Sequence, residues 1–405
     1  MRPHPLTEQL NATNAAVREE PLHEPDRWIA AGTPDQALVT RSIQFVLARI
    51  DAGLATFTDK FPAPSSIDGR YAPIENVEWT NGFWTGMLWL AYEITGEARY
   101  RAVAERHVAS FERRLDQRIN VDHHDLGFLY TLSCVSAYKL TADDAAKHSA
   151  LRAAEMLLAR YLPNAGIIQA WGDLSDPAQR GRMIIDCNLN LPLLYWATEI
   201  TGEQSFRSAA DMHVSRAAAH LARSDASTFH TFYMDGQSGA PLYGKTHQGH
   251  SDESCWARGQ AWGIYGFPLV CRYSPATALN HLTIKLANYF LNRSPDDGIC
   301  YWDLCFTSGS QPRDSSAAAI AACGLLELAK SLAPPQAETY RAAAWAIVKA
   351  LSREYLADAL PANGVLKHAV YHMPNRVGVD ESCIWGDYFY FEALMRLSRD
   401  WHPYW

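Results

Sequence analysis

One acid stands alone in an apolar stretch of the chain, where it is suited to proton transfer. Asp186 lies in RMIIDCNLNLPLLYW, residues 182–196, with no basic residue within three positions. A carboxyl group that loses hydration disfavours its charged form, so its pKa rises toward the range of a useful proton donor. Asn190 follows four residues later and is expected to share a helix face with Asp186. A structural aspartate bonded to a neighbouring loop is the alternative interpretation.

A second acid, Asp125, follows His123 and His124 at the start of another apolar stretch. On consecutive helices Asp125 and Asp186 would face each other across one end of a helical barrel. A pair of acids in a cleft is the arrangement that glycosidic chemistry uses. The histidines could indicate a metal site, but no third ligand stands at a fitting spacing. We therefore expect hydrogen bonding by His124, with no metal and no other cofactor.

A basic residue, Arg258, lies about one helical turn from Trp256 and Trp262 in a further apolar stretch. An unpaired buried arginine is costly. It requires an internal acid, for which Glu253 and Asp252 are candidates, or an anionic ligand such as a substrate carboxylate held by two hydrogen bonds. The spacing leaves both interpretations open.

The composition of the 405 residues excludes several classes of protein. Hydrophobic residues make up 48% and charged residues 20%, which is typical of a soluble protein with a large core. A net charge of −8 without a basic run argues against nucleic acid as a partner. No apolar stretch approaches the ~18 residues that span a membrane, and no signal peptide is visible. The eight cysteines include no CxxC pair, which indicates reduced thiols in a cytoplasmic protein.

The elements that position these residues are predicted to be almost entirely helical. The second helix of each successive pair is rich in aromatic and small residues, whereas the first is amphipathic, so the second helices should form an inner ring. This pattern predicts an all-α (α/α)6 barrel whose longer loops gather where the inner helices begin. The predicted helices are 34–56, 79–95, 97–118, 123–141, 142–162, 184–201, 203–222, 253–273, 276–293, 313–333, 336–355 and 381–399.

No linker divides the barrel, so residues 27–405 are predicted to form a single catalytic domain after a loosely ordered arm, residues 1–26. Strand-like stretches are short and resemble decoration on loops. They are residues 230–234, 298–302 and 365–371.

Six blocks, taken together and in order, resemble glycoside hydrolase family 88, the unsaturated glucuronyl hydrolases. The resemblance implies a cytoplasmic, metal-independent (α/α)6 barrel. It also implies removal of the 4,5-unsaturated uronic acid from the non-reducing end of oligosaccharides made by polysaccharide lyases, such as those from glycosaminoglycans. The blocks run from about Trp79 to Arg396: WTNGFWTGMLWLAYE, HDLGF, IIDCNLNLPLLYWA, HQGHSDESCWARGQAWGIYGF, RDSSAAAIAACGLLEL and CIWGDYFYFEAL.

The same resemblance assigns roles to individual residues. It implies that Asp186 is the general acid/base, which protonates C4 of the substrate's enol ether and then takes a proton from the water that adds at C5. Asp125 is implied to be the second essential carboxylate. Residues 371–376, YHMPNR, lack the Ser/Ser/Lys pattern by which some members recognise sulfate. The expected sugar contacts are the rings of Trp79, Trp171, Trp256 and Trp262 and the polar groups of His230, Gln248 and Arg258, to which His124 and Asn190 are added because they stand beside the two acids.

Three alternatives stay open at this point. An unsaturated rhamnogalacturonyl hydrolase shares the fold and the reaction class and differs in its aglycone. An (α/α)6 sugar epimerase would need a pair of histidines as proton shuttles, such as His230 and His372. A sugar-binding barrel without activity would bind an unsaturated disaccharide and release it unchanged.

Overall fold

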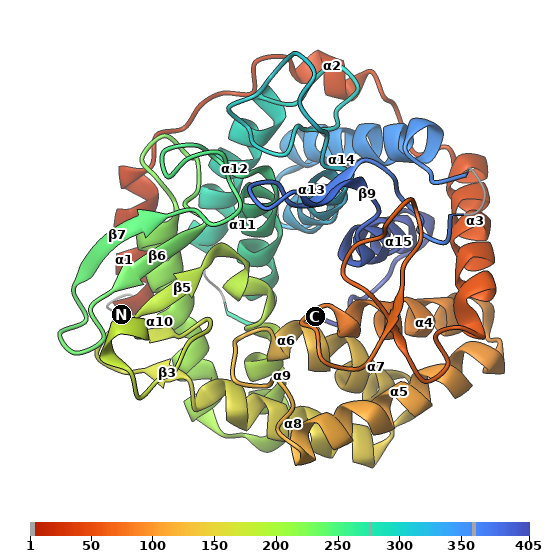
Figure 1. Cartoon of the computed structure of the whole chain (residues 1–405). Helices are drawn as coiled ribbons and strands as arrows, with labels where there is room; N and C mark the ends of the chain where they lie inside the picture. The colour runs from red at the N-terminus through yellow and green to blue at the C-terminus, as the bar shows by residue number, and fades with distance from the viewer. Residues whose placement is uncertain (1–4, 275–276, 359–361) are drawn as a thin grey trace.

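Two concentric rings of helices form the protein (Figure 1). The structure is a computed structural model that describes residues 5–274, 277–358 and 362–405. Helices of the outer ring present one apolar face to the interior and one polar face to solvent. Within the described residues the outer ring consists of six helices: α3 (Gln36–Leu54), α5 (Ala98–Asp116), α8 (Asp144–Leu158), α10 (Gln204–Leu221), α12 (Thr277–Asn292) and α14 (Pro334–Glu354).

The inner ring is buried on nearly all sides. Every residue of α11 (Ala257–Val270) and α13 (Ser315–Ala329) is buried, as expected for helices made mostly of apolar and small residues. The two rings confirm the predicted (α/α)6 barrel. Within the described residues the inner ring has six members: α4 (Asn81–Thr95); α6 (Leu126–Tyr130) with the π-helical turn η1 (Thr131–Val135) and α7 (Ser136–Thr141); the 3-10 helix η3 (Ile185–Leu189) with α9 (Pro192–Thr201); α11 (Ala257–Val270); α13 (Ser315–Ala329); and α15 (Ile384–Ser398).

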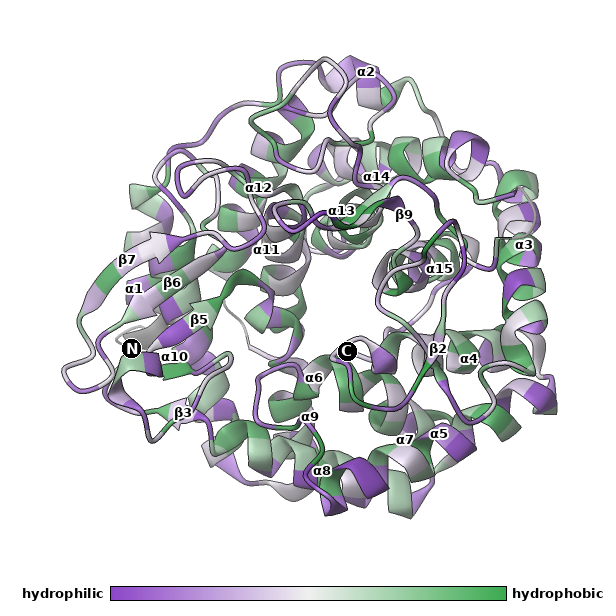
Figure 2. Ribbon diagram, in the orientation of Figure 1, coloured by the Kyte–Doolittle hydropathy of each residue, from purple (hydrophilic) through white to green (hydrophobic). Residues whose placement is uncertain are grey.

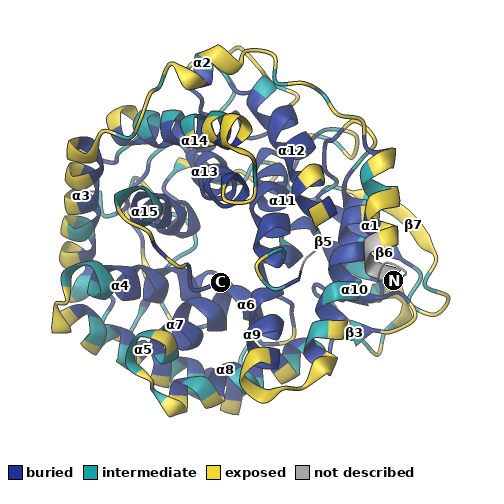
Figure 3. Cartoon of the chain, turned by 180° about the vertical axis from the view of Figure 1, so that it is seen from behind, coloured by how far each residue is buried: buried dark blue, intermediate teal, exposed yellow. Residues whose placement is uncertain are grey.

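The spacing of apolar residues explains which helices lie in the outer ring. In α3 the buried side chains Leu38, Val39, Ile43, Val46 and Ile50 recur at helical spacing, and the opposite face is exposed. Figure 2 shows this alternation of apolar and polar residues on the outer helices. Figure 3 shows the result from behind, with exposed stripes on the outer ring and buried inner helices.

The two ends of the barrel differ in their connections. Tight turns join α4 to α5 at Gly96 and α9 to α10 at Gly202. Both glycines cap the preceding helix in the left-handed conformation, with φ of 73° and 79°. At the other end, longer segments lead into the inner helices, as predicted, and this end has room for a binding site.

Short antiparallel strands stiffen the longer segments. Predicted strand-like residues 230–234 and 365–371 overlap β6 (Thr231–Met234) and β8 (Ala369–His372), which confirms them. Residues 298–302 contribute only the bridge between Tyr301 and Arg313. The pairs are β1 (Phe61–Pro62) with β2 (Pro73–Ile74), β3 (Tyr161–Leu162) with β4 (Ile167–Ile168), β5 (Arg182–Ile184) with β6 (Thr231–Met234) and β7 (Pro241–Lys245), and β8 (Ala369–His372) with β9 (Val377–Glu381).

The N-terminal segment is more ordered than its sequence predicts. It contains α1 (Pro5–Ala16) and α2 (Pro25–Ile29), and α1 packs against α10 and α12. The buried ammonium of Lys285 in α12 donates to the carbonyls of Asn14, at 2.5 Å, and Val17, at 2.8 Å. A loosely ordered arm is therefore not observed for residues 5–26. Residues 1–4 of the predicted arm and residue 276, the predicted start of a helix, lie outside the described residues.

Among the described residues, no helix is long and apolar enough to cross a membrane.

The contact between α1 and α12 gives a stability prediction. Lys285→Met keeps most of the aliphatic stem but leaves the carbonyls of Asn14 and Val17 without their buried donor, at a cost of about 1–3 kcal/mol. Urea unfolding measures this change, and limited proteolysis should cleave the N-terminal segment faster. Lys60→Met is the matched control, because Lys60 pairs with Glu75 at the surface and should contribute less than about 1 kcal/mol. Equal stabilities of the two variants would show that Lys285 does not anchor α1.

Candidate active site

A cavity of about 260 Å³ lies at the end of the barrel where the inner helices begin. It brings together every predicted site residue except Asn190, and adds Ile184 and His247. These residues come from separate loops and helix starts, so only the fold places them side by side. The lining residues are Trp79, His124, Asp125, Trp171, Ile184, Asp186, His230, His247, Gln248, Trp256, Arg258 and Trp262.

Asp125 stands at the N-cap position of α6, but its carboxylate does not cap the helix. Instead, Oδ2 lies 3.2 Å from His123 Nδ1, and Oδ1 lies 3.4 Å from His124 Nε2. Burial opposes ionisation of Asp125, but His124, His123 and Arg114 outweigh burial and lower its pKa. Asp125 is therefore the ionised acid of the pair.

Asp186 reaches the same imidazole, with Oδ1 3.4 Å from His124 Nε2. This buried oxygen has no hydrogen-bond partner among the described residues. Burial raises the pKa of Asp186 well above its usual range, the charge of Asp125 raises it further, and Arg258 opposes the rise. This direction agrees with the prediction, and Asp186 is the member of the pair that keeps its proton to higher pH. Burial also lowers the pKa of His124 to about 4, so the imidazole between the two acids is neutral near pH 7.

The backbone around Asp186 differs from the predicted helix 184–201. Residues 182–184 form β5, and Asp186 lies in the 3-10 helix η3. The α-helix starts only at Pro192, because proline fits the first turn of a helix and breaks its interior. Asp186 and Asn190 therefore do not share an α-helical face, and that prediction is wrong.

Asn190 connects the two elements that carry the acids. Its Oδ1 accepts a hydrogen bond from the backbone N–H of Phe128 in α6, at 2.9 Å. Gly127 permits this close approach, because a Cβ at that position would lie 2.2 Å from Asn190 Cα. Asn190 is buried and does not line the cavity, so the structure gives it a positioning role in place of the predicted substrate contact.

The two acids and His124 also have the composition of a metal site. His124, Asp125 and Asp186 each present one possible ligand atom, and these atoms lie within 4.8 Å of one another. The prediction that no third ligand joins His124 and Asp125 is wrong, because folding brings Asp186 beside them. A metal ion would bind the deprotonated carboxylate of Asp186. The raised pKa of Asp186 favours the proton instead, so metal independence stays a prediction.

Arg258 is buried, and the protein satisfies most of its guanidinium. One nitrogen lies 3.3 Å from Asp314 Oδ2, and the group also donates to the backbone carbonyls of Val370 and Tyr371 and to Gln248 Oε1. Asp314 also caps α13, so one acid holds both the helix and the arginine. The internal-acid interpretation is confirmed, and the guanidinium still lines the cavity.

The acids predicted to pair with Arg258 are wrong. Asp252 and Glu253 lie in the loop before α11, where their carbonyls accept hydrogen bonds from Arg223. The Asp252 carboxylate accepts from the backbone N–H of Thr246, at 2.7 Å. Asp314 is 56 residues from Arg258 in the chain, so sequence spacing gave no sign of this pair.

Aromatic rings form much of the remaining wall. Trp79 stacks on Trp385 with centroids 5.3 Å apart, and its Nε1–H donates to Tyr371 Oη at 3.2 Å. The ring of Trp256 lies 4.4 Å from the Arg258 guanidinium carbon. Rings fixed by stacking and hydrogen bonds offer flat apolar surfaces to a sugar without further loss of side-chain freedom.

His230 is fixed as a neutral donor. Its Nδ1 accepts the backbone N–H groups of His247, at 3.0 Å, and Gln248, at 3.3 Å, so the proton resides on Nε2. Burial, followed by the charges of His247 and Arg258, lowers the pKa of His230 well below its usual value. His372 does not line the cavity, and its Nδ1 accepts from Asn375 N–H at 3.2 Å.

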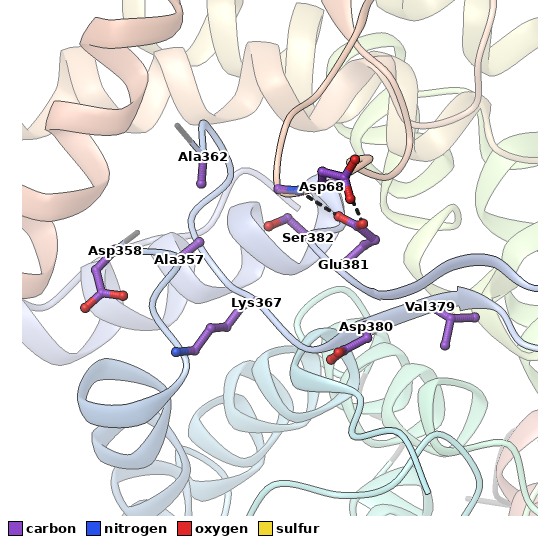
Figure 4. A pocket seen from close by; sticks show the side chains of 10 residues that line it. Asp68, Ala357, Asp358, Ala362, Lys367, Val379, Asp380, Glu381 and Ser382 are labelled. Carbon is purple, nitrogen blue, oxygen red and sulfur yellow. Dashed lines mark hydrogen bonds between the residues drawn. The ribbon is translucent and has the colours of Figure 1, made fainter. Parts of the chain in front are cut away.

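A larger cavity of about 490 Å³ lies beside the β8–β9 hairpin. Figure 4 shows its side chains, with Glu381 directed at the backbone N–H of Asp68, from which it accepts a hydrogen bond at 2.8 Å. Asp380 at its edge pairs with His368. No aromatic ring lines this cavity within the described part of the chain, so the smaller cavity is the candidate active site.

Sequence reasoning did not assign several residues that shape the site. Ile184 lines the cavity from the end of β5, His247 lines it from the loop after β7, and Tyr371 holds Trp79. His247 and Tyr371 lie in stretches that already stood out for their polar residues. Ile184 carries no signal that separates it from a core residue.

Comparison with known proteins identifies the family. A model described as Glycosyl Hydrolase Family 88 matches residues 50–386. The chain belongs to glycoside hydrolase family 88. An unsaturated chondroitin disaccharide hydrolase of Streptococcus pyogenes serotype M1 is 45% identical over 390 residues, which cover 95% of this chain and 98% of that protein. The unsaturated glucuronyl hydrolase of Bacillus sp. strain GL1 is 47% identical over 358 residues, covering 87% and 94%.

Solved structures of family 88 agree with the fold. The crystal structure of an unsaturated glucuronyl hydrolase from Streptococcus agalactiae matches with a TM-score of 0.94 and 44% identity, covering 96% of this chain and 99% of that one. A mutant of that enzyme has been solved in complex with dGlcA-GalNAc6S. The chain is thus a glycoside hydrolase of the unsaturated glucuronyl hydrolase type.

The buried pair of Arg258 and Asp314 predicts coupled losses of stability and affinity. Arg258→Met leaves Asp314 unpaired and fully buried, which should cost about 3–5 kcal/mol of stability. It should also raise KM for an anionic sugar more than it lowers kcat. The double variant Arg258→Met/Asp314→Asn should recover stability, because the amide oxygen can still cap α13, while KM stays high. A double variant with a restored KM would contradict the predicted contact of Arg258 with substrate.

The coupled acids predict a pH effect. If Asp186 must be protonated, kcat/KM falls on the alkaline side with an apparent pKa that belongs to the pair. Asp125→Asn removes the like charge, so this limb should move to lower pH by about one unit. The variant should also be slower, because Asp125 helps to position Asp186 or the sugar. A kcat/KM–pH profile of both proteins measures the shift, and a limb that stays in place refutes the coupling.

Proposed function

We propose that residues 27–405 act as one catalytic unit that releases the 4,5-unsaturated uronic acid from glycosaminoglycan-derived oligosaccharides. The observation that carries this proposal is the pair of carboxyl groups of Asp186 and Asp125, both 3.4 Å from one imidazole nitrogen of His124, in a cavity lined by tryptophans and one guanidinium. The cation suits the uronate carboxylate, the rings suit the sugar faces, and the protonated acid suits an enol ether. Relatives named for unsaturated chondroitin disaccharides support this substrate class.

Asp186 performs both proton transfers in the proposed reaction. Its carboxyl group gives a proton to C4 of the C4=C5 double bond, and the positive charge that develops at C5 is shared with the ring oxygen. Water attacks C5 and returns its proton to the Asp186 carboxylate. The resulting hemiketal opens and expels the aglycone. One acid is sufficient because the second transfer reverses the protonation change of the first.

The neighbouring groups support both proton transfers and hold the substrate in place. Asp125 carries the negative charge that favours the protonated form of Asp186. The same charge stabilises the cation that develops at C5. His230 offers an Nε2–H donor to a sugar oxygen. Arg258 and Gln248, already bonded to each other, present a fixed polar edge toward the uronate carboxylate.

The alternative activities fit the geometry less well. An epimerase would need two histidines that exchange protons, but His230 has its Nδ1 occupied and its pKa lowered, and His372 lies outside the cavity. An unsaturated rhamnogalacturonyl hydrolase would use the same proton transfers and differ only in aglycone preference. Residues 371–376 lack the Ser/Ser/Lys pattern, so we expect no dependence on sulfate.

The compartment is part of the proposal. Six of the cysteines are free and buried: Cys134, Cys187, Cys255, Cys300, Cys323 and Cys383. Free thiols persist in a reducing compartment, which supports action in the cytoplasm on oligosaccharides that have been imported. Neither a membrane nor nucleic acid is proposed as a partner.

A panel of lyase products tests the function. The conjugated double bond absorbs ultraviolet light, so its loss reports turnover directly. Unsaturated disaccharides from hyaluronan, from chondroitin with and without sulfate, and from rhamnogalacturonan separate the proposed activity from its close alternative. Binding without loss of absorbance identifies a sugar-binding protein, and an isomerised product identifies an epimerase.

The assigned acid gives a direct prediction. Asp186→Asn keeps the size of the side chain and removes its proton, so activity should fall by about 10²–10⁴-fold with little change in melting temperature. Asp211→Asn is a matched control, because Asp211 lies in α10 of the outer ring, where its Oδ1 accepts a hydrogen bond from the Tyr195 hydroxyl. Turnover by the Asp186 variant within tenfold of wild type would remove Asp186 from the mechanism.

Metal independence gives another prediction. The protonated state of Asp186 that the reaction needs is incompatible with metal ligation by that carboxyl group. Treatment with EDTA should therefore leave activity and melting temperature unchanged. A fall in either that added Zn²⁺ or Ca²⁺ reverses would contradict the proposed role of Asp186.

A further inference from the structure

A ladder of side chains leads from the active-site cavity to the surface. Arg182, Tyr233 and Tyr243 are register partners on the adjacent strands β5, β6 and β7. Partners in register point to the same face of a sheet. The Arg182 guanidinium carbon lies 5.2 Å from the centre of the Tyr233 ring, and Tyr233 stacks on Tyr243 with centroids 4.8 Å apart at an interplanar angle of 23°.

The inner end of this ladder is part of the cavity. Trp171 lines the cavity, and its ring centre lies 4.6 Å from the Arg182 guanidinium carbon. Ile184, two residues after Arg182 and so on the same face of β5, also lines it. His247 joins the middle of the ladder to the site, since its Nε2 lies 3.3 Å from Tyr233 Oη.

The outer end of the ladder is open to solvent. Tyr243 is 54% exposed on β7, an edge strand that pairs only with β6 among the described strands. Figure 1 shows β5 nearest the barrel centre and β7 at the outside, so the ladder runs outward. The Tyr243 ring is therefore held by stacking on one side while much of its surface stays accessible to a ligand.

We propose that this ladder is a distal subsite for the third and fourth sugar units of an unsaturated tetrasaccharide. The inference rests on the proposed function and adds a preference for chain length. A cavity of about 260 Å³ falls below the roughly 300–1,000 Å³ of sites that enclose drug-sized ligands, so a tetrasaccharide must extend beyond it. The ladder offers stacking surfaces in continuous contact with the cavity wall, and Arg182 places a positive charge beside the acidic sugars of such a chain.

Adjacent residues on β7 provide a matched test. Tyr243→Ala removes the outermost ring, whereas Leu242→Ala removes an equally exposed side chain, at 55%, that is not one of the stacked rings of the ladder. Steady-state kinetics with the unsaturated disaccharide and tetrasaccharide from hyaluronan give the ratio of the two kcat/KM values. We expect Tyr243→Ala to lower the tetrasaccharide-to-disaccharide ratio by about threefold to tenfold. Leu242→Ala should leave the ratio as in wild type, and Tyr243→Phe should retain it.

The outcomes separate this inference from the proposed function. Turnover of the disaccharide by Tyr243→Ala verifies that the variant is folded. An unchanged ratio in that variant, or an equal fall in Leu242→Ala, overturns the distal subsite while the proposed function stands. Wild-type protein that consumes neither substrate overturns the proposed function, and the subsite with it.

Discussion

Two carboxyl groups meet one neutral imidazole inside the barrel, and the site depends on keeping them in different protonation states. Asp125 and Asp186 both reach His124 Nε2 at 3.4 Å. Two negative charges close together in a buried site raise the free energy, so one acid ionises and the other keeps its proton. The surroundings decide which: burial raises the pKa of Asp125 less than His124, His123 and Arg114 lower it, whereas burial and the charge of Asp125 raise the pKa of Asp186. Asp186 Oδ1 also has no hydrogen-bond partner among the described residues. A proton donor near neutral pH results from this asymmetry.

The asymmetry survives only if the two acids cannot move apart. The hydrogen bond from Phe128 N–H to Asn190 Oδ1 fixes α6 against η3, and Gly127 leaves no room for a side chain between them. Arg258 provides a second constraint, since its bonds to Asp314 and to two carbonyls of β8 tie three parts of the chain together. A buried cation must be satisfied internally, and here its partners also shape the wall that faces the sugar.

The sequence pattern predicted the barrel because the burial of a helix determines which residue types occur at every one of its turns. Helices such as α11 and α13 consist mostly of apolar and small residues and are buried on all sides, so their place in the inner ring follows largely from composition. The same logic placed Asp125, Asp186 and Trp256 at helix starts on one end. The predictions of helix boundaries and of individual side-chain partners were less accurate, because they depend on single residues. Pro192 delays α9 and puts Asp186 on a 3-10 turn, and the pair of Arg258 and Asp314 spans a distance in the chain that no periodicity reports.

The site divides into two walls of different construction. Proton transfer depends on helix starts that are locked into the core, where a change at Asn190 or Gly127 would disturb the barrel itself. The sugar wall depends on the β5–β6–β7 sheet and the β8–β9 hairpin, which lie on loops and tolerate substitution at their outer edges. Such a division lets the acid pair stay constant while the recognised saccharide changes. The exposed edge at Tyr243 and the loop 371–376 are then where specificity can vary at the least cost to stability.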